Sequence, residues 1–426
     1  MIIQPASHLK GTLSIPGDKS ISHRSIMFGS IAKGTTKIHN FLMGDDCLST
    51  IECFRKLGID IEMHNDYILV HGKGLHGLKP ASEILDCGNS GTTTRLISGI
   101  LAGQPFTSTL TGDASIQKRP MKRIIEPLRQ MHAAIEGKDD NFCPLTISPS
   151  TLEGICYTSP VASAQVKSCV LLAGLYANTP TTVCEPALSR DHTERMLSAF
   201  GAIIERKDKC VTIYPNPELE AMEVIVPGDI SSAAFFMVAG LIVPNSKLIL
   251  QNVGINPTRR GILDALLAMG GHITCFNERE LCGEPVCDMI IESSDLHGIT
   301  IEGDIIPTMI DEIPAFAVAA LFAHGTTIIK DAKELRVKES NRIDTMCHEL
   351  GKMGVVIRPL EDGMIIEGNA TLHGAILESY DDHRIAMSLA VAALKATTPS
   401  QILNSECIRI SYPHFFEHLK AVSTKA

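Results

Sequence analysis

Apolar and polar positions follow one pattern that recurs six times along the chain. Each recurrence starts with a polar, glycine-containing turn, continues with an apolar stretch rich in Ala and Ser that predicts a helix, and ends with a β-branched run that predicts a strand. The residues that mark the six openings are Ser20, Thr92, Gln165, Ser231, Glu312 and His383. Successive markers are 72, 73, 66, 81 and 71 residues apart. Because this period is longer than the roughly 20–50 residues of a solenoid repeat, it indicates a small layered α/β module.

A second helix is predicted in five of the recurrences. Each of these helices ends in a turn that leads into a further strand. The turns lie at Leu57–Ile61, Met131–Ile135, Phe200–Ile204, Met269–Ile273 and Met353–Ile357. Each module is therefore predicted to have the order β-α-β-α-β-β. The chain as a whole is predicted to be an α/β (α+β) protein of six modules.

Two of the openings contain a Pro-Gly dipeptide, and these divide the chain. Pro16-Gly17 and Pro227-Gly228 lie 211 residues apart, which is three module lengths, and Pro followed by Gly is typical of a turn. We expect residues 16–227 to form one three-module domain and residues 1–15 with 228–426 to form the other. Hinges are expected near 16–17 and 227–228, with the active site in the interdomain cleft.

Composition narrows the choice of partners. The 426 residues include 38 Lys and Arg against 48 Asp and Glu, a formal net charge of −10, and only 4% are aromatic. Neither a basic face for nucleic acid nor a stacking platform is expected. The longest apolar run, Ala233–Val243, is too short to span a bilayer, and the amino terminus lacks a signal-peptide pattern. We expect a cytoplasmic protein without nucleic-acid or membrane partners.

Thirteen Cys residues are scattered along the chain without a C-x-x-C motif. This pattern is not typical of a disulfide framework or a structural zinc site. We expect reduced and mostly buried cysteine side chains.

Cations gather at the predicted helix starts although the chain is acidic overall. Lys19 and Arg24 follow the first opening, Arg95 the second, and Arg384 the sixth. Free backbone N–H groups and the positive end of the helix dipole favour anions at such starts, and an adjacent cation completes the site. A capped helix with a surface cation explains any single start. The recurrence of the pattern instead indicates ligands that carry phosphate or carboxylate groups.

Two carboxylates are candidates for acid–base chemistry. Asp311 precedes a predicted helix and lies between hydrophobic residues, where a carboxylate acts as an amino cap or as a general base. Glu339 lies beside Lys338 and three residues before Arg342, an arrangement that suits proton transfer or simple pairing on a helix surface. The sequence alone favours the cap for Asp311 and surface pairing for Glu339.

Eight motifs spread from end to end carry a resemblance to a known family. They are Gly17–Arg24, Gly88–Arg95, Lys118–Pro120, Ser163–Ser168, Ser189–Glu194, Met309–Glu312, Leu335–Arg342 and Asp382–Met387. Together they resemble the 5-enolpyruvylshikimate-3-phosphate synthases of the enolpyruvyl transferase superfamily. The resemblance implies two similar domains, each of three β-α-β-α-β-β units around a pseudo-threefold axis.

The resemblance also implies a reaction. The enolpyruvyl group of phosphoenolpyruvate is transferred to the 5-hydroxyl of shikimate 3-phosphate through a tetrahedral intermediate, and phosphate is released. This is a step of the shikimate pathway to chorismate and the aromatic amino acids, and it is the target of glyphosate. The resemblance implies a monomer with no metal or organic cofactor.

Site residues are implied by motif position. Asp311 would accept the proton of the 5-hydroxyl, and Glu339, with Lys338 nearby, would exchange a proton with the methylene carbon of phosphoenolpyruvate. The residues implied to bind shikimate 3-phosphate are Lys19, Ser20, Arg24, Ser163, Ala164, Gln165, Arg190, Asp311 and Lys338. Those implied to bind phosphoenolpyruvate are Lys19, Gly91, Arg119, Gln165, Arg342 and Arg384.

Some positions depart from well-known members of the family. The departures are Ala164, His192, Glu334 and Ile410, which stand where many members have Ser, Tyr, Asn and Lys. The first two are similar to the divergent subgroup that contains glyphosate-tolerant members, with Arg190 compensating at the phosphate. Position 91, however, is Gly in this chain, whereas strongly tolerant members have Ala there. The resemblance therefore leaves the glyphosate response open.

Two alternatives remain. A UDP-N-acetylglucosamine enolpyruvyl transferase typically carries a Cys at the position of Ala114, which argues against this function. A non-catalytic two-domain anion-binding protein would not need Asp311 and Glu339 as a paired acid and base.

Overall fold

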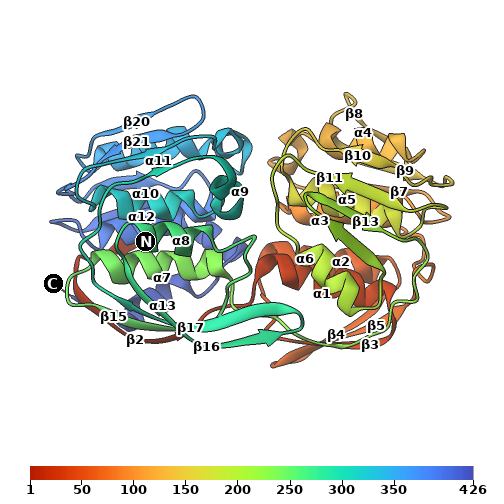
Figure 1. The fold of residues 1–426 in the computed structure, drawn as a ribbon, viewed down its shortest axis with the longest axis horizontal. Coiled ribbons are helices and arrows are strands. Elements are labelled where there is room, and N and C mark those ends of the chain that lie inside the picture. Colours follow the sequence, from red (N-terminus) through yellow and green to blue (C-terminus); the bar gives the residue numbers. More distant parts are fainter. Residues whose placement is uncertain (426) are drawn as a thin grey trace. The chain divides into compact units, whose positions relative to one another are not determined.

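The computed structural model describes residues 1–425, which form two compact units (Figure 1). Unit 1 comprises Met1–Pro16, Pro227–Glu280 and the chain from Pro285 onward, whereas unit 2 comprises Gly17–Val226 and Leu281–Glu284. The structure assigns the short segment 281–284 to unit 2. The sequence-based division had assigned it, with the rest of 228–426, to the other domain. The hinge role of the two Pro-Gly pairs stays a prediction.

Unit 2 contains three four-stranded sheets, with orders β14-β3-β5-β4, β6-β7-β9-β8 and β10-β11-β13-β12. Its elements are α1 (Lys19–Ile31), β3 (Lys33–His39), α2 (Asp45–Lys56), β4 (Asp60–Met63), β5 (Tyr67–Lys73), β6 (Leu85–Asp86), α3 (Gly91–Leu101), β7 (Ser108–Thr111), the 3₁₀-helix η1 (Ile116–Lys118), α4 (Lys122–Gln130), β8 (Ala134–Lys138), β9 (Phe142–Ser148), β10 (Cys156–Thr158), α5 (Ala164–Gly174), β11 (Thr181–Cys184), α6 (His192–Ala199), β12 (Ile204–Lys207), β13 (Cys210–Ile213) and β14 (Glu223–Ile225).

Unit 1 also contains three sheets, with orders β16-β17-β15-β2-β24, β18-β19-β21-β20 and β1-β23-β22. Its elements are β1 (Ile2–Ile3), β2 (Ala6–Ser14), α7 (Ile230–Ile242), β15 (Lys247–Gly254), α8 (Gly261–Ala268), β16 (His272–Leu281), β17 (Glu284–Glu292), β18 (Thr300–Ile301), the 3₁₀-helix η2 (Gly303–Ile305), α9 (Ile306–Met309), α10 (Ile313–Leu321), β19 (Thr326–Ile329), the 3₁₀-helix η3 (Lys333–Val337), α11 (Arg342–Lys352), β20 (Ile357–Pro359), β21 (Met364–Glu367), β22 (Ile376–Glu378), α12 (His383–Ala393), β23 (Ser400–Leu403), the 3₁₀-helix η4 (Ser405–Ile410), α13 (Phe415–Val422) and β24 (Ser423–Lys425).

The sheets repeat one pairing pattern. In β6-β7-β9-β8, the first pair is parallel and the next two pairs are antiparallel, and the other three four-stranded sheets follow the same scheme. A parallel pair needs a crossover, which a helix such as α3 supplies, whereas the antiparallel pair β8–β9 needs only a tight turn. The predicted six β-α modules in two similar units are confirmed, although the last module lacks the terminal hairpin.

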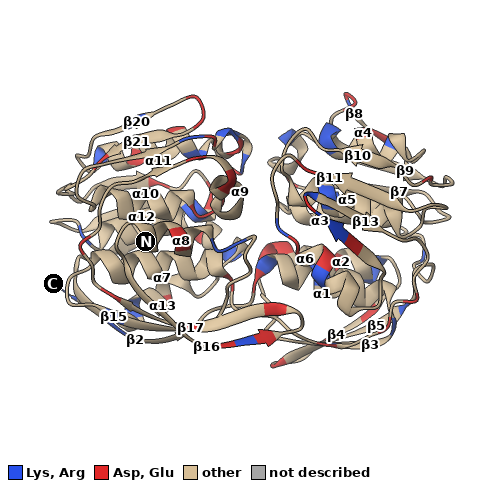
Figure 2. Ribbon diagram, viewed as in Figure 1, with Lys and Arg blue, Asp and Glu red and all other residues tan. Residues whose placement is uncertain are grey.

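One helix of each module lies in the interior of its unit. These inner helices are α1, α3 and α5 in unit 2 and α7, α10 and α12 in unit 1, and each follows one of the six openings. Every residue of α7 is buried, and α7, α10 and α12 pack on one another. Neither α7 nor α10 contains a charged residue (Figure 2). The apolar, Ala-rich composition of these stretches therefore reflects burial on all sides.

The second helices end as the turn pattern predicted. Gly58, Gly201, Gly270 and Gly354 follow α2, α6, α8 and α11 with φ of +85°, +104°, +90° and +91°. Glycine adopts this left-handed conformation without the steric cost of a Cβ, so it terminates each helix. After α4 the corresponding turn uses His132, with a φ of +65°.

The prediction that the cysteines are reduced is wrong for one pair. Cys184 and Cys210 form a disulfide, whereas the other eleven cysteines are free. The two residues lie opposite each other on the antiparallel strands β11 and β13, with their Cα atoms 4.1 Å apart. Strand register, which their separation of 26 residues does not reveal, brings them together. Each helix of the described chain is too short or too polar to traverse a lipid bilayer.

The contact between α3 and α5 provides a test of the packing. A Cβ added at Gly99 would lie 2.2 Å from the backbone oxygen of Cys169, so Gly99→Ala must separate the two helices. We expect this overpacking to reduce the stability of unit 2 by about 1–3 kcal/mol. The matched control is Gly351→Ala in α11, where nothing lies within 4 Å of the added Cβ. This control should raise stability by up to ~1 kcal/mol because alanine favours helix. Urea midpoints that move in the same direction for both variants would contradict the packing argument.

Candidate active site

The inner helices of unit 2 start with polar caps. The Asp18 carboxylate accepts a hydrogen bond from the Ile21 N–H at the start of α1, and Ser90 and Ser163 cap α3 and α5 with their hydroxyl oxygens. The Ser163 hydroxyl oxygen accepts from the Val166 N–H at 3.5 Å, which leaves its O–H to donate to another acceptor. Because serine caps carry no charge, the dipoles at α3 and α5 favour an added anion.

Arg24 is a buried cation held by three segments of unit 2. Its Nε donates to Thr193 Oγ1 at 2.7 Å, its Nη1 to the Ser20 carbonyl at 2.9 Å, and its Nη2 to Ser168 Oγ at 2.9 Å. Burial, and to a smaller extent the charge of nearby Arg190, lower the pKa of Arg24 to about 10 against the opposing effect of carboxylates. Two like charges, one of them buried, favour an anionic ligand that compensates both.

Three residues implied to bind phosphoenolpyruvate come together at the starts of α3 and α5. Gln165 accepts a 2.5 Å hydrogen bond from Arg95 Nη1 and donates to Thr92 Oγ1 at 3.1 Å. A Cβ added at Gly91 would lie 2.8 Å from Arg95 Nη1 and 3.3 Å from Arg119 Nη1. Glycine at position 91 therefore leaves room for two guanidinium groups beside the backbone of the helix start.

Lys19 and Arg190 are the two remaining unit 2 cations that the resemblance implies for the site. Lys19 Nζ forms an ion pair with Asp46 Oδ2 at 3.0 Å, a partner that the sequence did not indicate. Arg190 lies in the segment between β11 and α6, directly after the buried Ser189. Ser20 and Ala164 lie in the first turns of α1 and α5.

The two acid–base candidates, Asp311 and Glu339, both form ion pairs with the guanidinium group of Arg342 in unit 1. Arg342 Nη1 is 3.3 Å from Asp311 Oδ1, and Arg342 Nη2 is 2.5 Å from Glu339 Oε2. Asp382 accepts from Arg342 Nε at 2.8 Å, and Lys338 Nζ lies 3.2 Å from Asp311. Burial opposes the charge on Arg342, but Asp382 and Glu339 outweigh burial and raise its pKa above the usual value. Arg342 thus holds three carboxylates together.

The structure corrects the two interpretations that the sequence alone favoured for this cluster. Asp311 is not the cap of α10, because that helix starts at Ile313 and Glu312 occupies the cap position. Asp311 faces Lys338 and Arg342 instead. The spacing of three between Glu339 and Arg342 does produce a pair, but Arg342 is 1% exposed, so the pair is not on a helix surface.

Glu312 lies where the starts of the three inner helices of unit 1 meet. Its Oε1 accepts a short hydrogen bond from Ser231 Oγ of α7 and lies 3.9 Å from Arg384 Nη1 of α12. Arg259 Nη2 lies 3.5 Å from the same oxygen and 3.2 Å from Asp229, the cap of α7. The sequence pattern marked Glu312 as a module opening and as part of the motif Met309–Glu312 but gave it no role, and it did not indicate Arg259. A charged residue directly before the apolar stretch of α10 was the signal available in the sequence.

A buried ion network in unit 2 was also missed. Lys167 lies between Glu185 and Glu194, each 2.9 Å from its Nζ. The resemblance included Lys167 and Glu194 within motifs but gave them no role. A lysine inside the apolar helix α5 was the available signal, since lysine is rarely fully buried unless it is paired.

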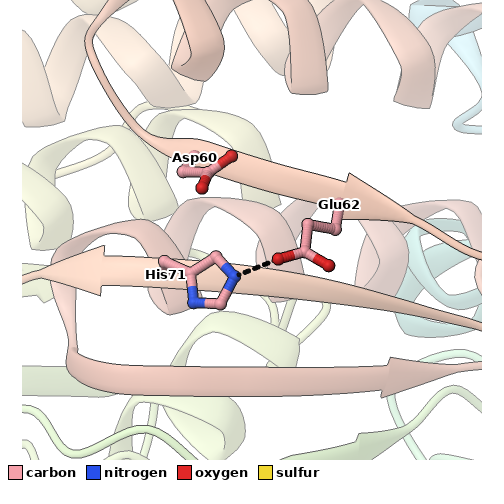
Figure 3. A group of neighbouring side chains, drawn as sticks. All are labelled: Asp60, Glu62 and His71. Atoms are coloured by element: carbon pink, nitrogen blue, oxygen red, sulfur yellow. Dashed lines mark hydrogen bonds and ion pairs between the residues drawn. The ribbon is translucent and has the colours of Figure 1, made fainter.

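Two side-chain groups of the described residues offer the atoms that metal ions bind. Figure 3 shows Asp60, Glu62 and His71 on the neighbouring strands β4 and β5. Glu62 is hydrogen-bonded to His71 Nε2 at 3.0 Å and to His64 Nε2 at 3.1 Å, and these bonds lower the pKa of Glu62. Cross-strand hydrogen bonding on an exposed sheet accounts for this group.

The second group is Asp191, His192 and Glu284. His192 Nδ1 lies 2.8 Å from Glu284 Oε1, and both side chains are buried. The Asp191 carboxylate is paired with Arg195 at 2.8 Å and with Arg206 at 3.3 Å. Two cations on one carboxylate disfavour a metal ion, so the group is explained as ion pairing.

Comparisons with known proteins extend these observations. The sequence model of the family "EPSP synthase (3-phosphoshikimate 1-carboxyvinyltransferase)" matches residues 3–419. The chain is similar to the 3-phosphoshikimate 1-carboxyvinyltransferases of Thermoanaerobacter pseudethanolicus, at 56% identity over 96% of each chain, and of Bacillus subtilis, at 54% over 98% of each.

Solved structures agree. An EPSP synthase from Acinetobacter baumannii matches with a TM-score of 0.89 and 46% identity, covering 100% of this chain and 98% of that one. The enolpyruvyl transferase NikO from Streptomyces tendae matches with a TM-score of 0.81 over the same shares, and at 16% identity it shows the fold alone. The six-module architecture is therefore that of the enolpyruvyl transferases. Within them, the chain belongs to the EPSP synthase family.

A pH test addresses the cation cluster around Arg24. His23 is fully buried, with Nδ1 2.7 Å from Thr50 Oγ1, and burial, together with Lys19 and Arg24, lowers its pKa well below 6.5. The unfolded chain binds a proton at His23 below a pH of about 6.5, whereas the folded chain does not. Stability should therefore fall as pH decreases from about 7 to 5, by at most about 1.4 kcal/mol per pH unit from this group.

The variant His23→Gln should reduce that slope, and His272→Gln, at an exposed position, serves as the control. The measurement is the free energy of urea unfolding at a series of pH values. Identical slopes for the wild type and His23→Gln would show that His23 does not stay neutral in the folded protein.

Proposed function

We propose that this chain is a 3-phosphoshikimate 1-carboxyvinyltransferase, which transfers the enolpyruvyl group of phosphoenolpyruvate to the 5-hydroxyl of shikimate 3-phosphate and releases phosphate. Membership of the EPSP synthase family and identity of 54–56% to proteins with this name support the proposal. The structural observation that carries it is the attachment of Asp311 and Glu339 to the single guanidinium group of Arg342.

The two carboxylates have complementary roles in this proposal. Asp311 accepts the proton of the 5-hydroxyl while the oxygen bonds to C2 of phosphoenolpyruvate, and protonated Glu339 donates a proton to C3, which becomes a methyl group. The tetrahedral intermediate then loses phosphate by cleavage of the bond between C2 and the phosphate ester oxygen. The Glu339 carboxylate takes a proton back from the methyl group, which restores the C2–C3 double bond. Lys338, 3.2 Å from Asp311, stabilises the negative charge that moves through the site.

The cations bind and neutralise the two anionic substrates. In this proposal shikimate 3-phosphate is bound by Lys19, Ser20, Arg24, Ser163, Ala164, Gln165, Arg190, Asp311 and Lys338. Phosphoenolpyruvate is bound by Lys19, Gly91, Arg119, Gln165, Arg342 and Arg384. The proximity of the buried Arg24 to the partly exposed Arg190 supports the first set. The guanidinium groups around Gly91 support the second. Without such compensation the two anions would repel each other at the reaction distance. The cytoplasmic location, the monomeric state and the absence of a cofactor stay predictions.

A phosphate-release assay tests the proposal. With phosphoenolpyruvate present, we expect release when shikimate 3-phosphate is added and none with UDP-N-acetylglucosamine as the acceptor. Release with the sugar nucleotide alone would identify the other enolpyruvyl transferase activity.

The acid and base are tested in the same assay. Asp311→Asn and Glu339→Gln should each lower kcat by two or more orders of magnitude, as expected for the loss of a general base or acid, while the folded structure is retained. Asp344→Asn is the control, because Asp344 is an exposed partner of Arg336 in α11. Near-normal turnover by the Asp311 and Glu339 variants would refute their assigned roles.

Gly91→Ala tests the phosphoenolpyruvate site. The added Cβ would approach the guanidinium groups of Arg95 and Arg119 at 2.8 and 3.3 Å, so it crowds the space beside the helix start. We expect a higher KM for phosphoenolpyruvate and weaker inhibition by glyphosate, with little change in affinity for shikimate 3-phosphate. Equal glyphosate inhibition of the wild type and Gly91→Ala would remove the steric argument.

A further inference from the structure

The buried network of Lys167, Glu185 and Glu194 belongs to no step of the proposed reaction. All three side chains are at most 3% exposed. Burial opposes the charge of Lys167, but Glu194 and Glu185 outweigh burial and raise its pKa above the usual value. An ion pair held this deeply is weak evidence for stability, because apolar side chains of similar volume often stabilise a protein equally well. The role of this network is therefore inferred from the hydrogen bonds of its members rather than from their charges.

Glu185 joins two segments that carry residues proposed to bind shikimate 3-phosphate. Its Oε1 accepts from the Ser163 N–H at 3.1 Å and from the Ser189 hydroxyl at 2.6 Å. Its Oε2 accepts from the Ser189 N–H at 3.4 Å and lies 2.9 Å from Lys167 Nζ. Ser163 starts α5 and Ser189 precedes Arg190, so one carboxylate sets the spacing between the Ser163 hydroxyl and the backbone that carries Arg190.

The backbone of Glu185 is itself well anchored. The Glu185 N–H donates to the Lys209 carbonyl at 3.0 Å, which continues the pairing of β11 with β13. The Cys184–Cys210 disulfide lies one residue earlier. Glu185 therefore acts from a fixed strand end rather than from a mobile loop.

Lys167 has a second effect, on the charge available to a ligand. Glu194 is close enough to Arg24 to influence its titration, and Thr193, the residue before Glu194, accepts a hydrogen bond from Arg24. Because Lys167 neutralises Glu194 at 2.9 Å, less of the charge of Arg24 is offset by protein carboxylates. More of that charge remains for a bound anion.

We propose that Glu185, held by Lys167, is the positioning residue that confers selectivity for the phosphate group of the acceptor substrate. This inference rests on the proposed function, since it takes shikimate 3-phosphate as the ligand. Glu185 does not touch the substrate in this proposal. It fixes the distance between the Ser163 hydroxyl and the Arg190 segment, which together bind the phosphate.

The test compares two ligands that differ only in the phosphate. Dissociation constants for shikimate 3-phosphate and for shikimate are measured by titration calorimetry on the full-length protein. In Glu185→Gln the amide nitrogen faces either Lys167 and the Ser189 N–H or the Ser163 N–H and the Ser189 hydroxyl, so donor meets donor in either orientation. We expect Kd for shikimate 3-phosphate to rise at least tenfold and Kd for shikimate to change less than threefold.

Matched variants separate positioning from general destabilisation. Glu349→Gln removes another fully buried carboxylate, which pairs with Lys352 at 2.7 Å in unit 1, and it should leave the ratio of the two Kd values unchanged. Lys167→Arg keeps the charge and should preserve the ratio within threefold. Lys167→Met should raise the ratio of Kd for shikimate 3-phosphate to Kd for shikimate, as Glu185→Gln does. If Glu185→Gln fails to unfold cooperatively, Ser189→Ala replaces it, because this variant keeps the buried charges and should still weaken shikimate 3-phosphate selectively by at least threefold.

The outcomes are distinguishable. Wild-type protein that neither binds shikimate 3-phosphate nor releases phosphate in its presence overturns the proposed function and this inference together. Wild-type protein that does both, with a Glu185→Gln variant that binds shikimate 3-phosphate equally well, overturns the positioning role alone. Equal losses for both ligands also overturn it, because they indicate a merely structural role.

Discussion

The amino ends of the inner helices impose the constraint on which the rest of each unit depends. Every such end presents unsatisfied N–H groups and the positive end of a dipole, and in unit 1 the contacts of Glu312 with Ser231 and Arg384 show that three ends meet. Burial on all sides, as in α7, means that water cannot satisfy these groups along the helix. Negative charge has to be supplied at the helix starts, either by the protein or by a ligand.

The two units supply it differently. In unit 1 the protein provides carboxylates: Asp229 and Asp382 cap α7 and α12, and Glu312 lies between the helices. In unit 2 the caps of α3 and α5 are neutral serines. Arg24 and Arg95 lie beside these starts, held by polar groups such as Ser168 and Gln165. In unit 2 the Asp18 carboxylate caps α1, so the starts of α3 and α5 are the inner-helix starts of this unit that have a neutral cap.

A buried charged side chain destabilises the folded protein unless it is paired with an opposite charge. In each unit a buried cation is paired with two or three carboxylates. Arg342 connects Asp311, Glu339 and Asp382, so the acid and the base of the proposed reaction share one anchor. Lys167 plays the corresponding part for Glu185 and Glu194. The modules repeat in their sheets and turns, whereas these anchors occur once each. The repeated fold thus provides equivalent helix starts, and single residues make each start different.

The sequence by itself determined the six modules, the pairing of each opening with an inner helix, and the motifs that carry the family, because hydrophobic periodicity and turn chemistry are local properties. Gly58, Gly201, Gly270 and Gly354 were predictable for the same reason. Only the tertiary structure decided which charges face each other. It placed Asp311 on Arg342 and Lys338 instead of at a helix cap, joined Cys184 to Cys210 across two strands, and brought Glu185 to Ser163 and Ser189. These contacts depend on strand register and on helix packing between residues far apart in the chain, and neither leaves a periodic trace in the sequence.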